Sequence, residues 1–277
     1  MSDVNLTSLL LDPTKPVSAF TLGYCAIRTV LMALTYENPC LWTRLNKGKN
    51  DRVDVEGPFY LLNSPSREIE LGKGVIATYD LLKKFGPYLA IVRLISPEGE
   101  PLPNVTLDWW QADAVGEYYF TTYTLRGRIT TDANGYAEVL TIAPAPYGIG
   151  SALRAGHFHV HFWPPSASDS TKGSYEDLIT QMYICKANDP TPLENDFVNK
   201  WRSMKLGCML QSWSLPSKSY DDGRSYMDFP ELSDGDLETR KRVDWWNKML
   251  KENVDPELKV VGGAFTELKL TPKNKGY

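Results

Sequence analysis

The sequence has few residues that could serve as thiol or imidazole ligands, with four cysteines and three histidines in 277 residues. The cysteines show no Cys-x-x-Cys or Cys-x-His spacing, which argues against a thiolate zinc site or an iron–sulfur cluster. They stand at Cys25, Cys40, Cys185 and Cys208. In a cytosolic chain of this size, buried thiols are more typical than disulfides, and we expect buried thiols here.

Basic blocks and long apolar runs are also missing. The net charge is -4 and no Lys/Arg-rich segment occurs, which argues against a nucleic-acid partner. The most apolar window, residues 18–36, contains Arg28, is short for a bilayer-spanning helix and begins too late for a signal peptide. We therefore expect no membrane role and a cytoplasmic location. We interpret this window as a helix that is either buried or forms a homodimer.

One segment of the chain holds all three histidines: Arg154-Ala-Gly-His157-Phe-His159-Val-His161-Phe-Trp163. In an extended strand, side chains alternate between the two faces, so the histidines would share one face and the intervening apolar residues the other. Imidazole is the commonest metal ligand in proteins, and two imidazoles at positions i and i+2 of a strand can bind one ion. The pattern therefore predicts a metal site on this strand.

Short strands separated by tight turns favour a mainly β fold with an antiparallel β-sandwich core, an N-terminal helical segment and C-terminal helical or loop additions. We expect the helical segment over residues 1–50 and one β-sandwich domain over residues 51–277, with an irregular or helical insertion at about 190–257. The predicted strands are residues 88–95, 105–110, 126–131, 136–142, 157–163 and 178–185, with 258–261 and 264–270 as edge strands. A further helix is predicted from an N-cap at Ser233 onward, with Val243, Trp246 and Leu250 on its apolar face.

Two tyrosines stand in settings that need an explanation. Tyr118 follows the end of a predicted strand, and Tyr147 lies in a proline-rich loop shortly before Arg154. A phenol has a pKa of about 10, so it is a poor ligand near neutral pH unless a trivalent cation binds its anion. Two tyrosinates, one hydroxide and two neutral imidazoles cancel the charge of Fe³⁺, which makes such a site inexpensive to bury.

Several sequence elements resemble, in the same order, those of the intradiol ring-cleavage dioxygenases of the catechol, hydroxyquinol and protocatechuate type. They are Glu56-Gly-Pro-Phe-Tyr60, Asp108-Trp-Trp-Gln-Ala-Asp-Ala-Val-Gly-Glu-Tyr118, Leu125-Arg-Gly127 with Thr131-Asp-Ala-Asn-Gly-Tyr136, Pro144-Ala-Pro-Tyr147, Arg154-x-x-His157-x-His159 and Thr180-Gln-Met-Tyr183. The resemblance runs from about Val55 to Asp189. Its most specific part is the Arg-x-x-His-x-His element together with both tyrosines.

This resemblance implies a non-haem Fe(III) enzyme with one iron per chain. Such an enzyme cleaves the ring of a catechol-type substrate between its two hydroxylated carbons, with O₂ as co-substrate, to give a muconate-type diacid. The implied iron ligands are Tyr118, Tyr147, His157 and His159. Tyr147 is further implied to leave the metal when the diol binds and to take up a substrate proton. Arg154 matches the family arginine that faces the reacting ring, and Gln181 matches the glutamine that helps to hold the site.

A second register of the histidine strand is open at this point, because His159-Val-His161 also resembles the paired histidines of the family. Arg154 stands three residues before His157, and this spacing favours His157 and His159 as the ligands. We therefore expect His161 to lie beside the ligands or in the pocket.

Two other hypotheses compete with a dioxygenase. In the first, His157, His159 and His161 hold Zn²⁺, and the protein is a hydrolase that does not need the two tyrosines. In the second, the chain is a catalytically inactive β-sandwich binding module. The stacking surface of that module would consist of Trp109, Trp110 and Trp163.

Overall fold

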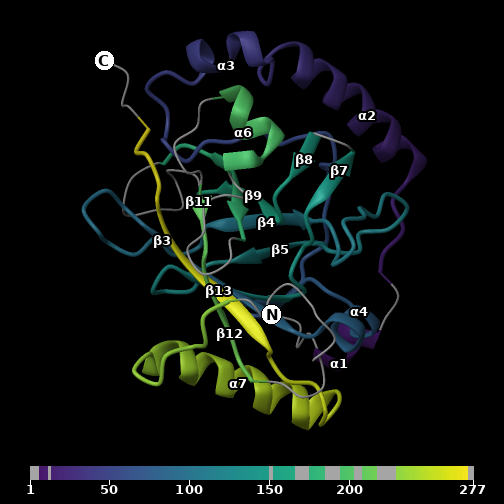
Figure 1. The fold of residues 1–277 in the computed structure, drawn as a ribbon, viewed down its shortest axis with the longest axis vertical. Helices are drawn as coiled ribbons and strands as arrows, with labels where there is room; N and C mark the ends of the chain where they lie inside the picture. The colour runs from purple at the N-terminus through teal and green to yellow at the C-terminus, as the bar shows by residue number, and fades with distance from the viewer. Residues whose placement is uncertain are drawn as a thin grey trace.

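Two β-sheets pack against each other at the centre of the molecule, and helices lie along its two ends (Figure 1). The computed structural model describes residues 6–11, 14–149, 152–165, 175–184, 194–202, 208–216 and 229–273. The main apolar core lies between the sheets, where the rings of Tyr88 and Phe158, one from each sheet, have centroids 5.9 Å apart. The prediction of a mainly β fold with helical additions is confirmed.

The first sheet has six strands in the spatial order β1, β2, β6, β3, β13, β12. Their bounds are Glu68–Glu70 (β1), Lys73–Val75 (β2), Tyr136–Thr141 (β6), Tyr88–Ile95 (β3), Gly262–Lys269 (β13) and Gln211–Ser214 (β12). Strand β3 is buried at every residue except Arg93, as its run of apolar residues predicts for a strand in the middle of a sheet.

The second sheet has five strands in the order β11, β10, β9, β4, β5. Their bounds are Cys208–Met209 (β11), Leu178–Tyr183 (β10), His157–Trp163 (β9), Thr106–Gln111 (β4) and Arg126–Thr130 (β5). A separate two-stranded ribbon consists of β7 (Tyr147–Ile149) and β8 (Ala152–Arg154). Tyr147 and Arg154 are direct partners across this ribbon, so it brings two predicted site residues together.

The sheets are mixed rather than antiparallel throughout. Strand β2 pairs in parallel with β6, β3 with β13, and β10 with β11. Alternation of apolar and polar residues indicates which face of a strand is buried, but it carries no information about the direction of the strand. Parallel partners require a long crossover between them, and a long stretch of chain separates the members of each of these pairs.

The predicted edge strands near the C-terminus are wrong. Residues 262–269 form the single strand β13, which lies between β3 and β12 inside the sheet. Gly263 permits this packing, because a Cβ there would lie 2.4 Å from the Leu89 carbonyl oxygen and 2.3 Å from the Trp213 ring. Glu267 and Lys269 are exposed and alternate with buried residues in the second half of β13. Charged residues at such positions are typical of edge strands, which is why an edge position was predicted.

The described helices are α1 (Leu6–Leu11), α2 (Ala19–Leu34), α3 (Pro39–Leu45), α4 (Tyr79–Phe85), α6 (Phe197–Arg202) and α7 (Leu237–Asn253). Helix α7 lies along the end of the molecule formed by the six-stranded sheet, and α2 and α3 lie at the opposite end (Figure 1). The N-cap of α7 is Asp236 rather than the predicted Ser233, since the Asp236 carboxylate accepts the backbone N–H of Thr239 at 3.0 Å. The predicted apolar face is buried, as expected, at Val243, Trp246 and Leu250.

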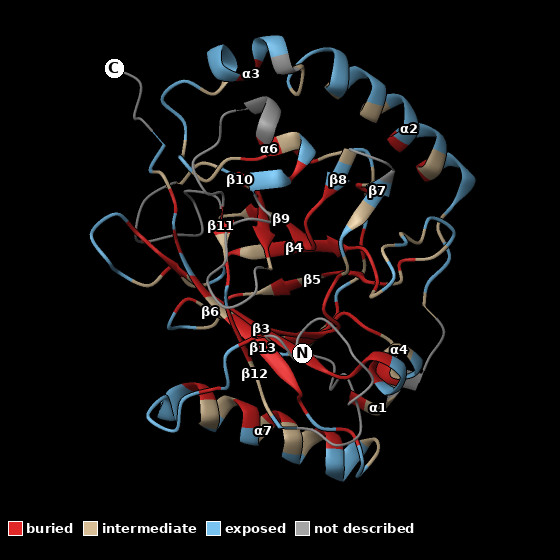
Figure 2. Ribbon diagram, viewed as in Figure 1, coloured by how far each residue is buried: buried red, intermediate tan, exposed pale blue. Residues whose placement is uncertain are grey.

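Helix α2 leaves its apolar face exposed (Figure 2). The side chains of Ile27 and Leu34 are 66% and 65% exposed. Burial of this window within the chain is therefore wrong, and the alternative, a dimer-forming helix, stays a prediction. In the described part of the chain, no helix has both the length and the apolar character needed to cross a bilayer.

The cysteines differ in their surroundings. Cys25 and Cys208 are buried free thiols, as expected. Cys40 is a free thiol at an exposed position in the short helix α3, so the expectation of burial is wrong there. Cys185 lies outside the described residues.

Candidate metal centre

Strand β9 places two histidines on the same face, next to each other. His157 and His159 are each 1% exposed, and Phe158 between them packs into the core, as the alternation of a strand requires. The Nε2 atoms of the two imidazoles lie 3.0 Å apart. Two nitrogens bound to one ion at about 2 Å and at a right angle would be separated by about 3 Å, so this spacing suits two ligands of a single metal.

The two imidazole rings are held in different ways. Nδ1 of His157 donates to the carbonyl oxygen of Ala155 at 2.6 Å, because a carbonyl can only accept. Nε2 of His157 is therefore the unprotonated nitrogen that a metal requires. The His159 ring stacks on the indole of Trp110 with centroids 4.9 Å apart, and its buried Nδ1 has no hydrogen-bond partner among the described residues.

Two loops bring Tyr118 and Tyr147 to the same point. The Tyr147 hydroxyl lies 3.5 Å from Nε2 of His157 and 3.5 Å from the Tyr118 hydroxyl. Gly116, with φ at +89°, allows the two loops to approach, because a Cβ at this position would lie 2.9 Å from the Cβ of Tyr147. Two phenol oxygens and two imidazole nitrogens thus converge from three separate segments.

Burial governs the protonation of this cluster. Burial raises the pKa of Tyr118 well above its ordinary value of 10, with the neighbouring Tyr147 adding to the effect, and burial also raises the pKa of Tyr147. Burial and the adjacent His157 lower the pKa of His159 well below 6.5. Only positive charge at the centre can make both buried phenols ionise. Two phenolates and two neutral imidazoles form a donor set that fits a trivalent metal ion.

His161 does not join the cluster. Its Nε2 faces the Asp177 carboxylate at 3.6 Å, and burial lowers the pKa of its imidazole to about 4. It lines a separate cavity of about 630 Å³ together with Trp42 and Glu56. Among the described residues, no group of three or more His, Cys, Asp or Glu side chains is placed to hold one ion, so the three-histidine zinc arrangement is not found.

The tryptophans do not form the surface that an inactive binding module would need. Trp109 and Trp110 are 0% and 1% exposed, and both belong to the buried interior. The Trp163 ring packs against His161 with centroids 4.8 Å apart. A stacking platform of three exposed indoles is therefore contradicted.

Arg154 and Gln181 meet beside the histidines. Nη2 of the buried Arg154 donates to the side-chain oxygen of Gln181, which also accepts the Tyr183 hydroxyl at 2.7 Å. Gln181 pairs with His159 across β9 and β10, and its amide nitrogen donates to the carbonyl oxygen of Val55 at 2.9 Å. The two residues that the sequence singled out as supporting groups thus lie in one hydrogen-bonded network next to the predicted ligands.

Sequence reasoning missed two buried carboxylates in this network. Asp196 accepts from Nε of Arg154 at 2.9 Å, and Asp54 accepts from the Tyr183 hydroxyl at 3.1 Å. In the sequence, Asp196 looks like an ordinary N-cap before a short helix. Such a residue gives no indication of an ion pair with a distant arginine. Tyr183 was already part of the family resemblance, and it shares a strand face with Gln181 because it follows that residue by two positions.

The ring of Phe59 closes one side of the cluster. Its centroid lies 4.5 Å from that of Tyr118 and 6.5 Å from that of Tyr147. The loop that carries Phe59 is attached to helix α2 by an ion pair between Arg28 and Glu56. The N-terminal helical segment therefore contributes to the position of an aromatic side chain at the site.

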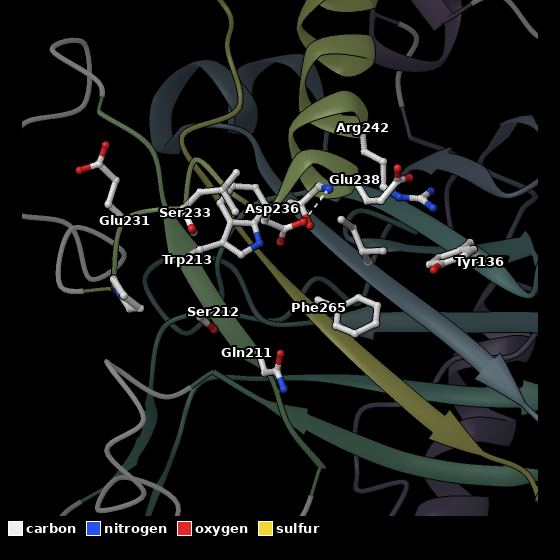
Figure 3. Close-up of a pocket in the computed structure, with 14 residues that line it drawn as sticks. Tyr136, Gln211, Ser212, Trp213, Glu231, Ser233, Asp236, Glu238, Arg242 and Phe265 are labelled. Atoms are coloured by element: carbon white, nitrogen blue, oxygen red, sulfur yellow. Dashed lines mark hydrogen bonds between the residues drawn. The ribbon is translucent and has the colours of Figure 1, made fainter. Parts of the chain in front are cut away.

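A second cavity, of about 560 Å³, lies against the six-stranded sheet at the N-terminal turn of α7 (Figure 3). Its described lining includes Trp213, Phe265 and Arg242, and it contains none of the predicted site residues. The converging phenols and imidazoles belong to the other sheet and its adjoining loops.

Comparison with known proteins places the chain in a family. A family model described as Dioxygenase matches residues 55–221, which is more than half of the chain. The chain belongs to the intradiol ring-cleavage dioxygenase family. The family resemblance predicted from the tyrosine and histidine elements is confirmed.

Curated relatives of this chain include chlorocatechol 1,2-dioxygenase of Pseudomonas putida, which is 31% identical over 152 residues, or 51% of this chain and 56% of the relative. The protocatechuate 3,4-dioxygenase beta chain of Burkholderia cepacia is 33% identical over 105 residues, or 33% of this chain and 42% of the relative. The aligned part thus spans about half of the length of these relatives.

Among solved structures, wild-type catechol 1,2-dioxygenase of Acinetobacter radioresistens superposes with a TM-score of 0.61 at 18% identity, covering 92% of this chain and 76% of that one. Catechol 1,2-dioxygenase of Pseudomonas arvilla C-1 gives a TM-score of 0.59 at 17% identity, covering 92% and 75%. At these identities the comparison shows that the fold is shared.

Proposed function

We propose that this intradiol dioxygenase holds one Fe³⁺ per chain and uses O₂ to cleave a catechol-type ring between its two hydroxylated carbons, giving a muconate-type diacid. The proposed protein ligands are Tyr118, Tyr147, His157 and His159. The observation that supports this most strongly is the convergence of two imidazole nitrogens and two phenol oxygens at one buried point. A trivalent ion neutralised by two phenolates is the occupant that suits a site of low dielectric.

Iron, when bound, supplies a centre that can hold both oxygens of an aromatic diol and allow the diol to react with O₂. The chain's own side chains prepare the diol for this step. Tyr147 begins strand β7, apart from the histidine strand, and its hydroxyl lies 3.5 Å from Nε2 of His157; it would hold the ligand position that the diol takes. The phenolate oxygen of Tyr147 would then be the general base that accepts one proton from the substrate.

The guanidinium of Arg154 is the fixed positive charge of the site. Gln181 and Asp196 hold it, so it need not reorganise when negative charge develops on the ring during the reaction. Phe59, packed against Tyr118, offers an aromatic surface to one side of a bound ring. Arg154 would stabilise the charge of a bound diol, and Phe59 would orient its ring.

The names of the relatives support the substrate class. Two of them are named for chlorocatechol and protocatechuate, and both compounds are aromatic ortho-diols. A catechol-type diol, in a catabolic or a biosynthetic pathway, is therefore the substrate class that we propose.

We further propose that the enzyme is a cytoplasmic homodimer. The exposed apolar face of α2, which includes Ile27 and Leu34, supports a dimer interface on that helix. The free thiols of Cys25 and Cys208 support a reducing compartment.

Anaerobic titration of the iron-loaded protein with a panel of catechols tests the proposed activity. A diol that replaces Tyr147 on the metal should shift the phenolate-to-iron absorption band in the visible range. Admission of O₂ should then yield a product that is heavier than the diol by one O₂. If no diol shifts the band, the dioxygenase proposal is contradicted, while the family fold stands.

A further inference from the structure

We propose that Asp196 is a positioning residue whose single carboxylate orients both the guanidinium of Arg154 and the imidazole of His157. The inference rests on the proposed function, because it assigns a role in the same reaction. Asp196 directly precedes helix α6, and its side chain is completely buried. None of the sequence elements that resemble the family pattern included it.

The first helical turn fixes the carboxylate in place. Oδ1 of Asp196 accepts the backbone N–H of Val198 at 2.9 Å and of Asn199 at 3.2 Å. These are N–H groups at the start of a helix, which have no acceptor within the helix itself. Rotation of the carboxylate would break both of these hydrogen bonds, so its direction is set by the chain around it.

The second oxygen holds two groups of the site. Oδ2 accepts Nε of Arg154 at 2.9 Å and the backbone N–H of Ala155 at 2.9 Å. Ala155 in turn accepts Nδ1 of His157 through its carbonyl oxygen at 2.6 Å. One oxygen therefore anchors the side chain that faces the ring and also the residue that fixes the orientation of a metal-binding imidazole.

The bonds to Arg154 leave one of its nitrogens for the substrate. Within the described part of the chain, Nε donates to Asp196, and Nη2 donates to Gln181 and to the Tyr183 hydroxyl. Nη1 is the remaining terminal nitrogen, and the planar guanidinium fixes its direction once the other two are held. The ion pair with Asp196 offsets the cost of burying the guanidinium, while the Nη1 end still presents its N–H groups and positive charge to the site.

The variant Asp196→Asn separates this role from simple packing. Its side chain has the same size and can still accept the Val198 and Asn199 N–H groups, but it loses the charge that pairs with Arg154. We expect kcat to fall by roughly 100-fold, the loss typical for removal of one preorganised stabilising group. The anaerobic dissociation constant for the diol should change by less than about threefold, because the two diol oxygens still bind the metal. A parallel loss of diol binding and kcat would overturn the proposal.

A double-mutant cycle tests whether Asp196 acts through Arg154. In the Arg154→Gln background, Asp196→Asn should lower kcat by less than about threefold further, because the group that it positions is already absent. Independent, multiplicative losses would show that Asp196 acts by another route.

If Asp196→Asn does not fold, Asp196→Glu replaces it, since the charge is kept and only the reach of the carboxylate changes. The same drop in kcat at constant diol affinity supports the role, and wild-type kcat in Asp196→Glu overturns it.

The wild-type titration separates failure of this proposal from failure of the proposed function. If the wild-type protein shows no band shift with any diol and no ring-opened product, the function fails, and the role of Asp196 in it fails as well. If the wild type turns over and Asp196→Asn does so at the same rate, only the positioning role is lost. The resting absorption band of Asp196→Asn adds a readout that does not depend on turnover, and we expect it to shift because the His157 ring loses its fixed anchor.

Discussion

At the scale of single residues, burial changes the pKa of the Asp108 carboxyl group. The carboxyl group is 1% exposed and accepts the Tyr60 hydroxyl at 2.9 Å. Burial raises its pKa from 3.8 to about 6, and the hydrogen bond from Tyr60 only partly opposes that change. The side chain lies on β4, next to the strand that carries the histidines.

This raised pKa makes stability depend on pH with a defined sign. Between about pH 4 and pH 6 the folded chain keeps a proton that the unfolded chain releases, so the contribution of Asp108 to stability is lost as pH rises. Since one pKa unit corresponds to about 1.4 kcal/mol, the whole change in the free energy of unfolding is about 3 kcal/mol. Urea unfolding of the wild type and of Asp108→Asn should show the variant gaining relative stability from pH 4 to pH 7. A relative loss over this range would contradict the raised pKa.

The residues of the site differ in how far the sequence could predict them. The alternation of the histidine strand predicted a metal site, the resemblance to the dioxygenases implied Tyr118, Tyr147, His157 and His159 as its ligands, and these four residues do converge. Asp196 was not found, because a carboxylate before a helix is common and its partner Arg154 lies far away in the chain. Pairings that form only through tertiary structure leave no pattern in the sequence.

At the level of elements, the start of α7 shows how a cap can be misplaced by one turn. Both Ser233 and Asp236 have the side chain of an N-cap, and they are three residues apart. The structure uses Asp236, whereas the Ser233 hydroxyl only accepts the N–H of Gly235 within the preceding turn at 3.2 Å. The periodicity of the helix was predictable, but the choice between two equivalent caps was not.

Alanine substitution at the two positions should distinguish them. Asp236→Ala removes the bond to the Thr239 N–H, and we expect the free energy of unfolding to fall by about 1 kcal/mol. Ser233→Ala is the matched control and should cost no more than about 0.5 kcal/mol. Chemical denaturation at neutral pH measures both, and a larger loss for Ser233→Ala would contradict the assignment of the cap.

For the strands, the local sequence pattern predicted where a strand forms but not which strands lie beside it. The strand containing the histidines and the strand at residues 88–95 were predicted from alternation and apolar content, and both are present. The central position of β13 was not predicted, because its parallel pairing with β3 depends on the path of the intervening chain. Alternation fixes a buried face, while neighbours and direction come from the topology.

At the scale of the whole molecule, the exposed face of α2 requires an explanation. Ile27, Val30, Leu31 and Leu34 are all more than half exposed on one helix. Apolar side chains at this spacing form a continuous stripe, and such a stripe on a surface is typical of an interface. Because α2 also anchors the Glu56 loop through Arg28, a dimer formed there would stabilise the wall of the site.

Substitution within this stripe tests the homodimer. The double variant Ile27→Glu and Leu31→Glu should be monomeric in sedimentation equilibrium at concentrations where the wild type is dimeric, because burying the added charges would be costly. Leu237→Glu is a matched control, since Leu237 is also 63% exposed but lies at the start of α7. A wild-type monomer, or a dimer that survives the double substitution, would contradict the proposed interface.

The visible absorption of the iron-loaded protein tests most directly whether the buried phenols bind a trivalent iron. The wild type should show a phenolate-to-iron charge-transfer band. Tyr118→Phe should lose that colour and the turnover, while Tyr119→Phe, which removes a neighbouring hydroxyl bonded to Asp113 at 3.1 Å, should keep both. A Tyr118→Phe protein that retains the full band would contradict the account.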